Sequence, residues 1–97
     1  MKGKRVKRPL YTFQPSGDTY TGEWIDEVRD GFGKQVWVDG SSYEGDWSNG
    51  MANGKGKFLH TNGDTYYGFW KDDKVDGFGT YTELKGVKYV GHWKEDS

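Results

Sequence analysis

Residues 43–56 of the chain read Tyr-Glu-Gly-Asp-Trp-Ser-Asn-Gly-Met-Ala-Asn-Gly-Lys-Gly, and this stretch decides the fold. It joins a Tyr-x-Gly-x-Trp motif to a later Gly-x-Gly motif, and both recur along the chain every 23 residues. No insertion or deletion breaks this interval between Gly17 and Trp93. Self-similarity at a fixed period is the sequence signature of tandem-repeat architectures. We therefore expect copies of one small unit.

The repeated positions carry rings and glycines. Each full repeat holds a tyrosine, a glycine and a tryptophan in the first motif, two glycines in the second, and one more glycine in a turn. The members are Tyr20, Tyr43, Tyr66 and Tyr89; Gly22, Gly45, Gly68 and Gly91; Trp24, Trp47, Trp70 and Trp93; Gly31 with Gly33, Gly54 with Gly56 and Gly77 with Gly79; and Gly17, Gly40, Gly63 and Gly86. Repeats are expected to start near Asp18, Ser41, Asp64 and Val87, and the last one lacks its Gly-x-Gly half.

Turn signals between β-prone runs indicate that the unit is a β-hairpin. Asp39-Gly40 and Asn62-Gly63 each separate such runs, a pattern that favours a two-residue type I′ turn. No apolar stripe of helical period competes with this interpretation. We expect eight short strands, near residues 11–14, 19–25, 32–38, 42–47, 55–61, 65–70, 78–84 and 88–93. The predicted fold class is all-β, an elongated single-layer antiparallel meander of β-hairpins.

A two-residue turn at Asp39-Gly40 also predicts which side chains share a face. It pairs Val36 with Tyr43 and Phe32 with Trp47, so these four side chains would project from one side of the sheet. The ring-bearing face would hold all the motif tyrosines and tryptophans with Phe13, Phe32, Val36, Leu59 and Phe78. The opposite, polar face would carry Thr21, Glu23, Glu44, Asp46, Gly33, Gly56, Gly79 and His60.

The ring-bearing face is the predicted interaction surface. A single sheet has no second layer to cover its rings, so we expect them to stay partly exposed along a groove. A contiguous apolar surface of this kind commonly marks an interaction site. The predicted partner-binding groove consists of Tyr20, Trp24, Phe32, Tyr43, Trp47, Tyr66, Trp70, Phe78, Tyr89 and Trp93.

The composition describes an ordered protein with an uneven charge distribution. Of the 97 residues 18% are aromatic and none is cysteine, which argues against intrinsic disorder and against a disulfide framework. The net charge is -1, but five basic residues among the first eight leave nine basic against 15 acidic residues in the remainder. We expect a flexible basic leader, residues 1–9, before one repeat domain, residues 10–97.

Residues that carry catalytic or metal chemistry are sparse. The two histidines, His60 and His92, fall in different repeats, and no nucleophile with an adjacent base is evident. The Gly-x-Gly pairs lack the third glycine of a dinucleotide-binding loop. Residues 72–83 partly match an EF-hand loop, but Lys74 occupies a ligand position and the flanking residues are β-prone. We expect no enzyme activity, no catalytic residue, no metal site and no cofactor.

Partners other than a protein segment in the groove remain as alternatives. The basic leader would contact an anionic membrane surface or form a solvated tail; its charges are Lys2, Lys4, Arg5, Lys7 and Arg8. Nucleic acid is not expected, because the remaining charges are mainly acidic and would repel phosphates. Self-association through an exposed end strand is a further alternative.

The four motifs, Tyr20-Thr-Gly-Glu-Trp24, Tyr43-Glu-Gly-Asp-Trp47, Tyr66-Tyr-Gly-Phe-Trp70 and Tyr89-Val-Gly-His-Trp93, together with the Gly-x-Gly pairs, resemble MORN repeats (membrane occupation and recognition nexus). The resemblance covers about residues 12–94. It implies a twisted meander of hairpins with an aromatic-lined groove. It also implies scaffolding, attachment to cytoskeleton, cilia or membranes, or a place beside kinase or methyltransferase domains. An intracellular protein, cytoplasmic or associated with the cytoskeleton or a cilium, is therefore expected.

Overall fold

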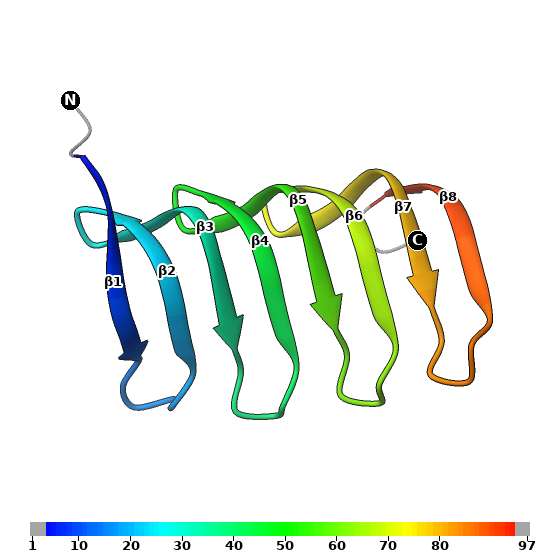
Figure 1. Ribbon diagram of the computed structural model, residues 1–97, viewed down its shortest axis with the longest axis horizontal. Coiled ribbons are helices and arrows are strands. Elements are labelled where there is room, and N and C mark those ends of the chain that lie inside the picture. Colours follow the sequence, from blue (N-terminus) through cyan, green and yellow to red (C-terminus); the bar gives the residue numbers. More distant parts are fainter. Residues whose placement is uncertain (1–3, 95–97) are drawn as a thin grey trace.

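A computed structural model of the chain describes residues 4–94. They form one sheet in which each strand pairs in antiparallel fashion with its neighbours along the chain (Figure 1). The strands are β1 (Arg5–Thr12), β2 (Thr19–Ile25), β3 (Val28–Val36), β4 (Ser42–Ser48), β5 (Met51–Leu59), β6 (Thr65–Lys71), β7 (Lys74–Thr82) and β8 (Lys88–Lys94). The predicted all-β meander of hairpins is confirmed, with a longest dimension of 41 Å. Among the described residues, no helix is long and apolar enough to cross a membrane.

The first strand begins earlier than the sequence predicts. We expected a strand near residues 11–14 behind a separate leader, whereas β1 starts at Arg5 and pairs with β2 from Ile25 to Thr19. Residues 5–8 of the basic segment therefore belong to the sheet. The run of basic residues gives no strand pattern in the sequence. The strand forms because β2 provides an edge for it to pair with. Lys2 lies outside the described residues.

The turn at Asp39-Gly40 differs from the prediction, and the difference moves every side chain of the hairpin. The Gly40 N–H donates to the Trp37 oxygen at 2.9 Å and the Trp37 N–H donates to the Ser41 oxygen at 2.9 Å, so three residues form the loop. Only the glycine has a positive φ, +96°, which fits a type I turn closed by a glycine bulge. A type I′ turn would need a positive φ at Asp39 as well.

The longer loop shifts the strand pairing by one residue. Tyr43 lies opposite Gln35 rather than Val36, and Trp47 lies opposite Gly31 rather than Phe32. Because side chains alternate along a strand, a one-residue slip exchanges the two faces of the paired strand. The predicted faces are therefore wrong for the Gly-x-Gly strands. Phe32, Phe78, Val36 and Leu59 point outward, while Gly33, Gly56, Gly79, Trp37 and His60 lie on the side of the motif rings.

Two-residue turns occur instead at the other end of the hairpins. Asn49 and Gly50 have φ values of 53° and 80°, and Asp72 and Asp73 have values of 49° and 70°. Both φ values are positive in each turn, as a type I′ hairpin requires. The strand bounds expected from the sequence, 42–47 and 55–61, leave a longer loop between them, whereas β4 and β5 extend up to the turn.

Each pair of strands bends at its facing glycines. Between the pairs Gly22–Gly33 and Trp24–Arg29, β2 contributes one residue and β3 contributes three, so a bulge interrupts the ladder. The same irregularity recurs in β4–β5 and β6–β7. Bulges bend and twist the strands that contain them. In Figure 1 the strands rise from one row of loops, turn over and run to a second row, so the sheet curls around an inner face.

The core lies inside this curl. Tyr20 and Tyr43 are 0% and 1% exposed, and the tryptophans Trp24 and Trp47 are 4% exposed. The expectation that a single sheet leaves these rings partly open is wrong, because the two arms of the bent sheet cover them from both sides. The face of the sheet that was predicted to form a binding groove is therefore in large part the interior of the protein.

Candidate functional site

The motif rings form one continuous ladder along the inner face. Tyrosine and tryptophan alternate, with ring centroids 5.1–6.0 Å apart and interplanar angles of 81–90°. Such edge-to-face contacts are favoured by the ring quadrupoles. Tyr20, Tyr43 and Tyr66 each contact the tryptophan of their own repeat and that of the next repeat. The order along the molecule is Trp24, Tyr20, Trp47, Tyr43, Trp70, Tyr66, Trp93.

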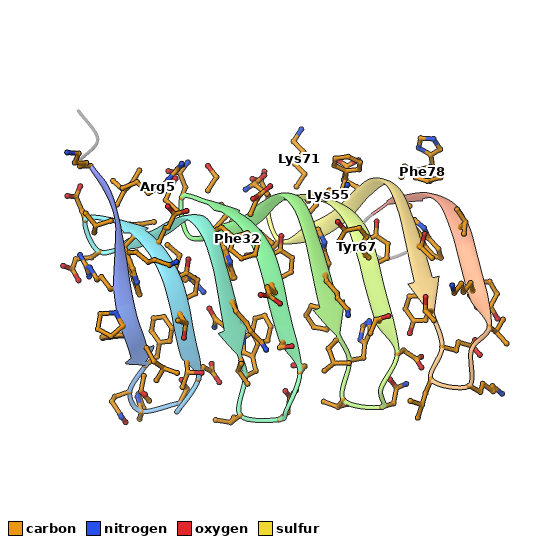
Figure 2. The ribbon with its side chains drawn as sticks, viewed as in Figure 1. Arg5, Phe32, Lys55, Tyr67, Lys71 and Phe78 are labelled. Carbon is orange, nitrogen blue, oxygen red and sulfur yellow. The ribbon has the colours of Figure 1, made fainter. Side chains whose placement is uncertain are left out.

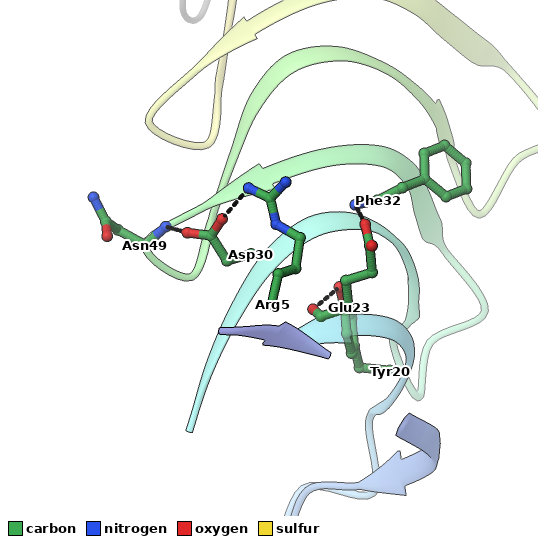
Figure 3. Close-up of polar contacts among 6 residues, drawn as sticks. All are labelled: Arg5, Tyr20, Glu23, Asp30, Phe32 and Asn49. Carbon is green, nitrogen blue, oxygen red and sulfur yellow. Dashed lines mark hydrogen bonds and ion pairs between the residues drawn. The ribbon is translucent and has the colours of Figure 1, made fainter. Parts of the chain in front are cut away.

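Glycine makes room for each tyrosine. A Cβ atom added at Gly33 would lie 2.0 Å from the Tyr20 hydroxyl oxygen, so only glycine fits beneath this ring. The hydroxyl donates a hydrogen bond to the Glu23 carbonyl oxygen at 2.8 Å (Figure 3). Burial raises the pKa of Tyr20 to about 12, and it also raises the pKa of Tyr43, whose hydroxyl donates to the Asp46 carbonyl oxygen at 3.0 Å.

The tryptophans are held by the second glycine motif. The indole N–H groups of Trp47, Trp70 and Trp93 donate to the carbonyl oxygens of Gly33, Gly56 and Gly79 at 3.0, 3.1 and 3.0 Å. In the described structure the buried Nε1 of Trp24 has no such acceptor. β1 lacks a Gly-x-Gly pair, and its pairing with β2 is irregular between Arg8 and Tyr11, where that acceptor would come from.

The accessible part of the inner face is lined both by predicted groove residues, such as Trp70 and Trp93, and by residues that were not predicted, such as Trp37. A first hollow of about 310 Å³ lies between β3 and the β6–β7 turn. A second hollow of about 370 Å³ adjoins it, because Phe58 and Trp70 line both. The first is lined by Arg29, Gln35, Trp37, Tyr43, Trp47, Gly50, Ala52, Phe58, Trp70 and Asp73, and the second by Phe58, His60, Tyr66, Trp70, Val75, Tyr81 and Trp93. We call the two hollows together the inner groove.

The first hollow is polar at one wall. The guanidinium carbon of Arg29 lies 4.7 Å from the centroid of the Trp47 ring, a cation–π distance. Its Nη2 donates to the Gly50 carbonyl oxygen at 2.8 Å and its Nη1 donates to Gln35 Oε1. Burial lowers the pKa of Arg29, and the charge of Asp73 opposes that effect. A fixed cation thus stands beside an open, ring-lined space.

The second hollow is apolar. Its lining is almost entirely rings, and the one histidine there, His60, lies 4.7 Å from the Phe58 ring and 5.6 Å from the Tyr81 ring. The prediction that His60 belongs to the polar outer face is wrong, since the register shift turns it inward. No partner in the described structure makes it a general base. It contributes a polarisable wall to an apolar space.

The predicted groove residues divide into four groups. Tyr20, Tyr43, Trp24 and Trp47 are buried ladder members that offer almost no surface, as does Tyr66 at 2% exposure. Trp70 and Trp93 are half-buried and line the hollows. Phe32 and Phe78 lie on the outer face, 54% and 49% exposed, so their placement in the groove is wrong. Tyr89 is 47% exposed, and its hydroxyl donates to Glu83 Oε2 at 3.0 Å.

The two arginines of the first strand have partners within the chain. Arg5 Nη2 forms an ion pair with Asp30 Oδ1 at 2.6 Å, and Asp30 Oδ2 accepts the Asn49 N–H at 3.2 Å (Figure 3). The hydrogen bond to Asp30 raises the pKa of Arg5. Arg8 donates to the Asp26 carbonyl oxygen at 2.6 Å and lies 5.2 Å from the Trp24 ring centroid. Both arginines therefore fasten β1 to the repeats.

The acidic residues of the EF-hand-like stretch serve the backbone. Asp73 Oδ1 accepts the Ala52 N–H at 2.7 Å, and Asp72 Oδ1 accepts the Asn53 side-chain amide at 3.4 Å. Residues 72 and 73 form a tight turn between two strands rather than a cation-binding loop. No cluster of three or more metal-ligating side chains occurs among residues 4–94.

These features define a class: a tandem β-hairpin repeat protein whose repeats join through an aromatic ladder. A family model for the MORN repeat matches three consecutive segments, residues 20–42, 43–65 and 66–82, which together span about two thirds of the chain. The chain belongs to the MORN repeat family. MORN repeats are interaction modules. No curated protein matches the chain at the significance threshold applied.

Proposed function

We propose that the inner groove binds a segment of a protein partner and that the chain acts as a non-catalytic scaffold. The observation that carries this proposal is the pair of adjoining hollows between β3 and β8. The ring ladder forms the floor of these hollows and leaves the space above it open. Clefts of about 300–1,000 Å³ lined by rings with few polar groups are typical binding sites. The groove has a charged end, lined by Arg29 and Asp73, and an apolar end. Its two ends therefore differ in chemistry. An oriented segment is the ligand that such an arrangement favours.

Groove variants must spare the ladder. Replacement of Trp47 would remove a core ring and unfold the repeat, so it does not separate binding from folding. Trp37 and His60 are half-buried, line the hollows and stand outside the ladder. Phe32 supplies the matched control, since it is an aromatic residue on the outer face of β3.

The experiment has two stages. Affinity capture with the wild-type chain, followed by mass spectrometry, yields partner candidates, and calorimetry then measures the affinity of each purified candidate. Trp37→Ala with His60→Ala is expected to raise the Kd at least tenfold, and Phe32→Ala is expected to leave it unchanged. Circular dichroism confirms that each variant is folded. A partner that binds the double variant as tightly as the wild type contradicts the proposal.

A cytoskeletal or ciliary setting remains a prediction from the family resemblance. Microscopy of the tagged chain in ciliated cells tests it directly. Membrane attachment through the basic segment is the less favoured alternative, because Arg5 and Arg8 are engaged within the fold and only Lys4 and Lys7 of the described leader charges are without such an assignment.

A further inference from the structure

The third repeat departs from the other two at one outward-facing position. Glu23 and Asp46 occupy this position in the first and second repeats, and each carboxylate accepts a bulge N–H of the following strand. The Phe32 N–H donates to Glu23 Oε1 at 2.7 Å, and the Lys55 N–H donates to Asp46 Oδ2 at 3.3 Å. The third repeat has Phe69 here. A hydrogen-bonding acid has been replaced by an apolar ring that cannot accept the equivalent N–H.

Phe69 lies among other exposed rings. Tyr67 precedes it on the same side of β6, and Phe78 follows on the neighbouring strand, directly after Gly77, whose added Cβ would lie 3.5 Å from the Phe69 Cβ. Tyr67, Phe69 and Phe78 are 50%, 46% and 49% exposed. Single exposed apolar residues need no explanation, but neighbouring ones indicate an interaction surface.

Two lysines flank these rings. Lys55 pairs with Phe69 across β5 and β6, and its ammonium lies 5.4 Å from the centroid of the Tyr67 ring. Lys71 follows Phe69 on the outward side of β6. Figure 2 shows Lys55, Lys71 and Phe78 along the crest where the strands turn over, with Tyr67 below them. We call Lys55, Tyr67, Phe69, Lys71 and Phe78 the crest patch.

The crest patch does not serve the core. The buried rings all belong to the inner face, on the other side of the sheet. An acidic residue at this position can accept the bulge N–H, as Glu23 and Asp46 do. Phe69 cannot accept that hydrogen bond, and it exposes apolar area to solvent. A function in binding accounts for both costs.

We propose that the crest patch is a second docking site, separate from the inner groove, for a short acidic protein segment that carries large apolar side chains. The exposed rings would receive the apolar side chains, and the ammonium groups of Lys55 and Lys71 would pair with flanking carboxylates. The proposal does not depend on the groove function, because the two surfaces lie on opposite faces of the sheet.

Charge along the crest favours a short segment over an extended anionic surface. Asp46 precedes the patch on the crest, and the exposed Asp72 and Asp73 follow Lys71 in the next turn. A membrane laid along the crest would meet these carboxylates as well as the two lysines, which weakens its attraction to this face. A peptide that covers only one repeat meets the two lysines and avoids them.

The test uses a variant that the repeat itself supplies. Phe69→Glu restores the residue type of the other two repeats, so it is expected to fold with unchanged or higher Tm while it abolishes the apolar contact. Lys55→Glu with Lys71→Glu reverses the charge of the patch. Phe32→Lys places on the first repeat the residue type that the second repeat carries at Lys55, and it is the matched control outside the patch.

The probe is a fluorescein-labelled decapeptide in which glutamate alternates with leucine, measured by fluorescence anisotropy against the full chain. We expect saturable binding that weakens with salt, a rise in Kd of at least tenfold in Phe69→Glu and in the double charge variant, and no change in Phe32→Lys or Trp37→Ala. The last variant separates this site from the groove.

Four outcomes overturn the proposal. They are equal binding by folded Phe69→Glu, loss of binding in Trp37→Ala, equal binding of the peptide with lysine in place of glutamate, and absence of peptide binding while the chain sediments with vesicles of phosphatidylcholine and phosphatidylserine at 4:1. The last result assigns the patch to lipid instead.

Discussion

Glycine decides the packing at the residue scale, and it does so for a different reason at each position. Gly45 and Gly91 occupy the same place in the Tyr-x-Gly-x-Trp motif. A Cβ atom at Gly45 would lie 2.4 Å from Gly56 Cα and 2.5 Å from the Lys55 carbonyl oxygen, whereas a Cβ atom at Gly91 would meet nothing within 4 Å. The backbone contact at Gly45 cannot be relieved by a rotamer change.

The pair therefore makes a matched prediction. Gly45→Ala is expected to lower the free energy of unfolding by about 1–3 kcal/mol, because it overpacks two backbones. Gly91→Ala should leave it unchanged or raise it by up to about 1 kcal/mol, since alanine restricts the unfolded chain. Urea denaturation of both variants measures the difference. Equal effects would show that the close strand approach is not what requires glycine.

Buried tyrosines make the stability depend on pH at the alkaline end. Burial raises the pKa of Tyr20 to about 12 from an ordinary value of 10. Between these values the unfolded chain loses the phenolic proton and the folded chain keeps it, so the free energy of unfolding falls as pH rises from about 10 to 12. For Tyr20 the loss approaches about 2–3 kcal/mol.

Urea denaturation at pH 9 and pH 11.5 checks this slope. Tyr20→Phe is expected to be less stable at pH 9, because the hydrogen bond to the Glu23 carbonyl oxygen is lost, and to show a shallower fall above pH 10. If the wild type and Tyr20→Phe lose stability equally above pH 10, ionisation of Tyr20 is not the cause of the fall.

Strands and their order are readable from the sequence at the element scale, but the register is not. The 23-residue period and the glycine turns predict eight strands, and eight are found. The Asp39-Gly40 pair, however, suits two loop lengths, and the sequence gives no preference strong enough to separate them. The ring packing decides, because only the three-residue loop puts Tyr43 and Trp47 of β4 on the same face as Gly33 of β3. That single residue of register explains why Phe32 and Phe78 were assigned to the groove and Trp37 and His60 were not.

The loop length can itself be tested. Deletion of Val38, which is 69% exposed, leaves Trp37 opposite Ser41 across a two-residue Asp-Gly turn, so both faces keep their side chains. We expect a folded protein destabilised by about 1 kcal/mol, mainly through the lost hydrogen bond from the Val38 N–H to Asp18.

Deletion of Val36 from the same strand is the control. It moves Gly31 and Gly33 of β3 to the other face relative to β4 and is expected to abolish the cooperative transition. Thermal denaturation followed by near-ultraviolet circular dichroism compares the two. Equal tolerance of both deletions would contradict the register described above.

The whole molecule behaves as a row of nearly equivalent units. Each described strand pairs only with its sequence neighbours, and Tyr20, Tyr43 and Tyr66 each bridge two repeats. In such arrays stability approximates a sum of unit and nearest-neighbour terms. The two ends of the described sheet differ: β1 carries no Gly-x-Gly motif, and β8 pairs with β7 within the described residues.

Removal of one period tests this picture. Deletion of residues 43–65 joins Ser42 to Tyr66 in register, and we expect a shorter, folded protein whose urea m-value falls by about a quarter. Deletion of residues 43–64, one residue less, shifts the faces and should not fold. Small-angle scattering and urea titration distinguish the outcomes. A folded product from both deletions would argue against a fixed period.

The ladder of rings also gives the protein an optical property. Each of the three core tyrosines lies 5.1–6.0 Å from two tryptophan rings, a separation at which an excited tyrosine passes its energy to tryptophan before it emits. Emission from these tyrosines is therefore quenched while the curl is closed and recovers as the strands part. The tyrosine fluorescence of the unlabelled chain therefore reports how many repeats remain folded.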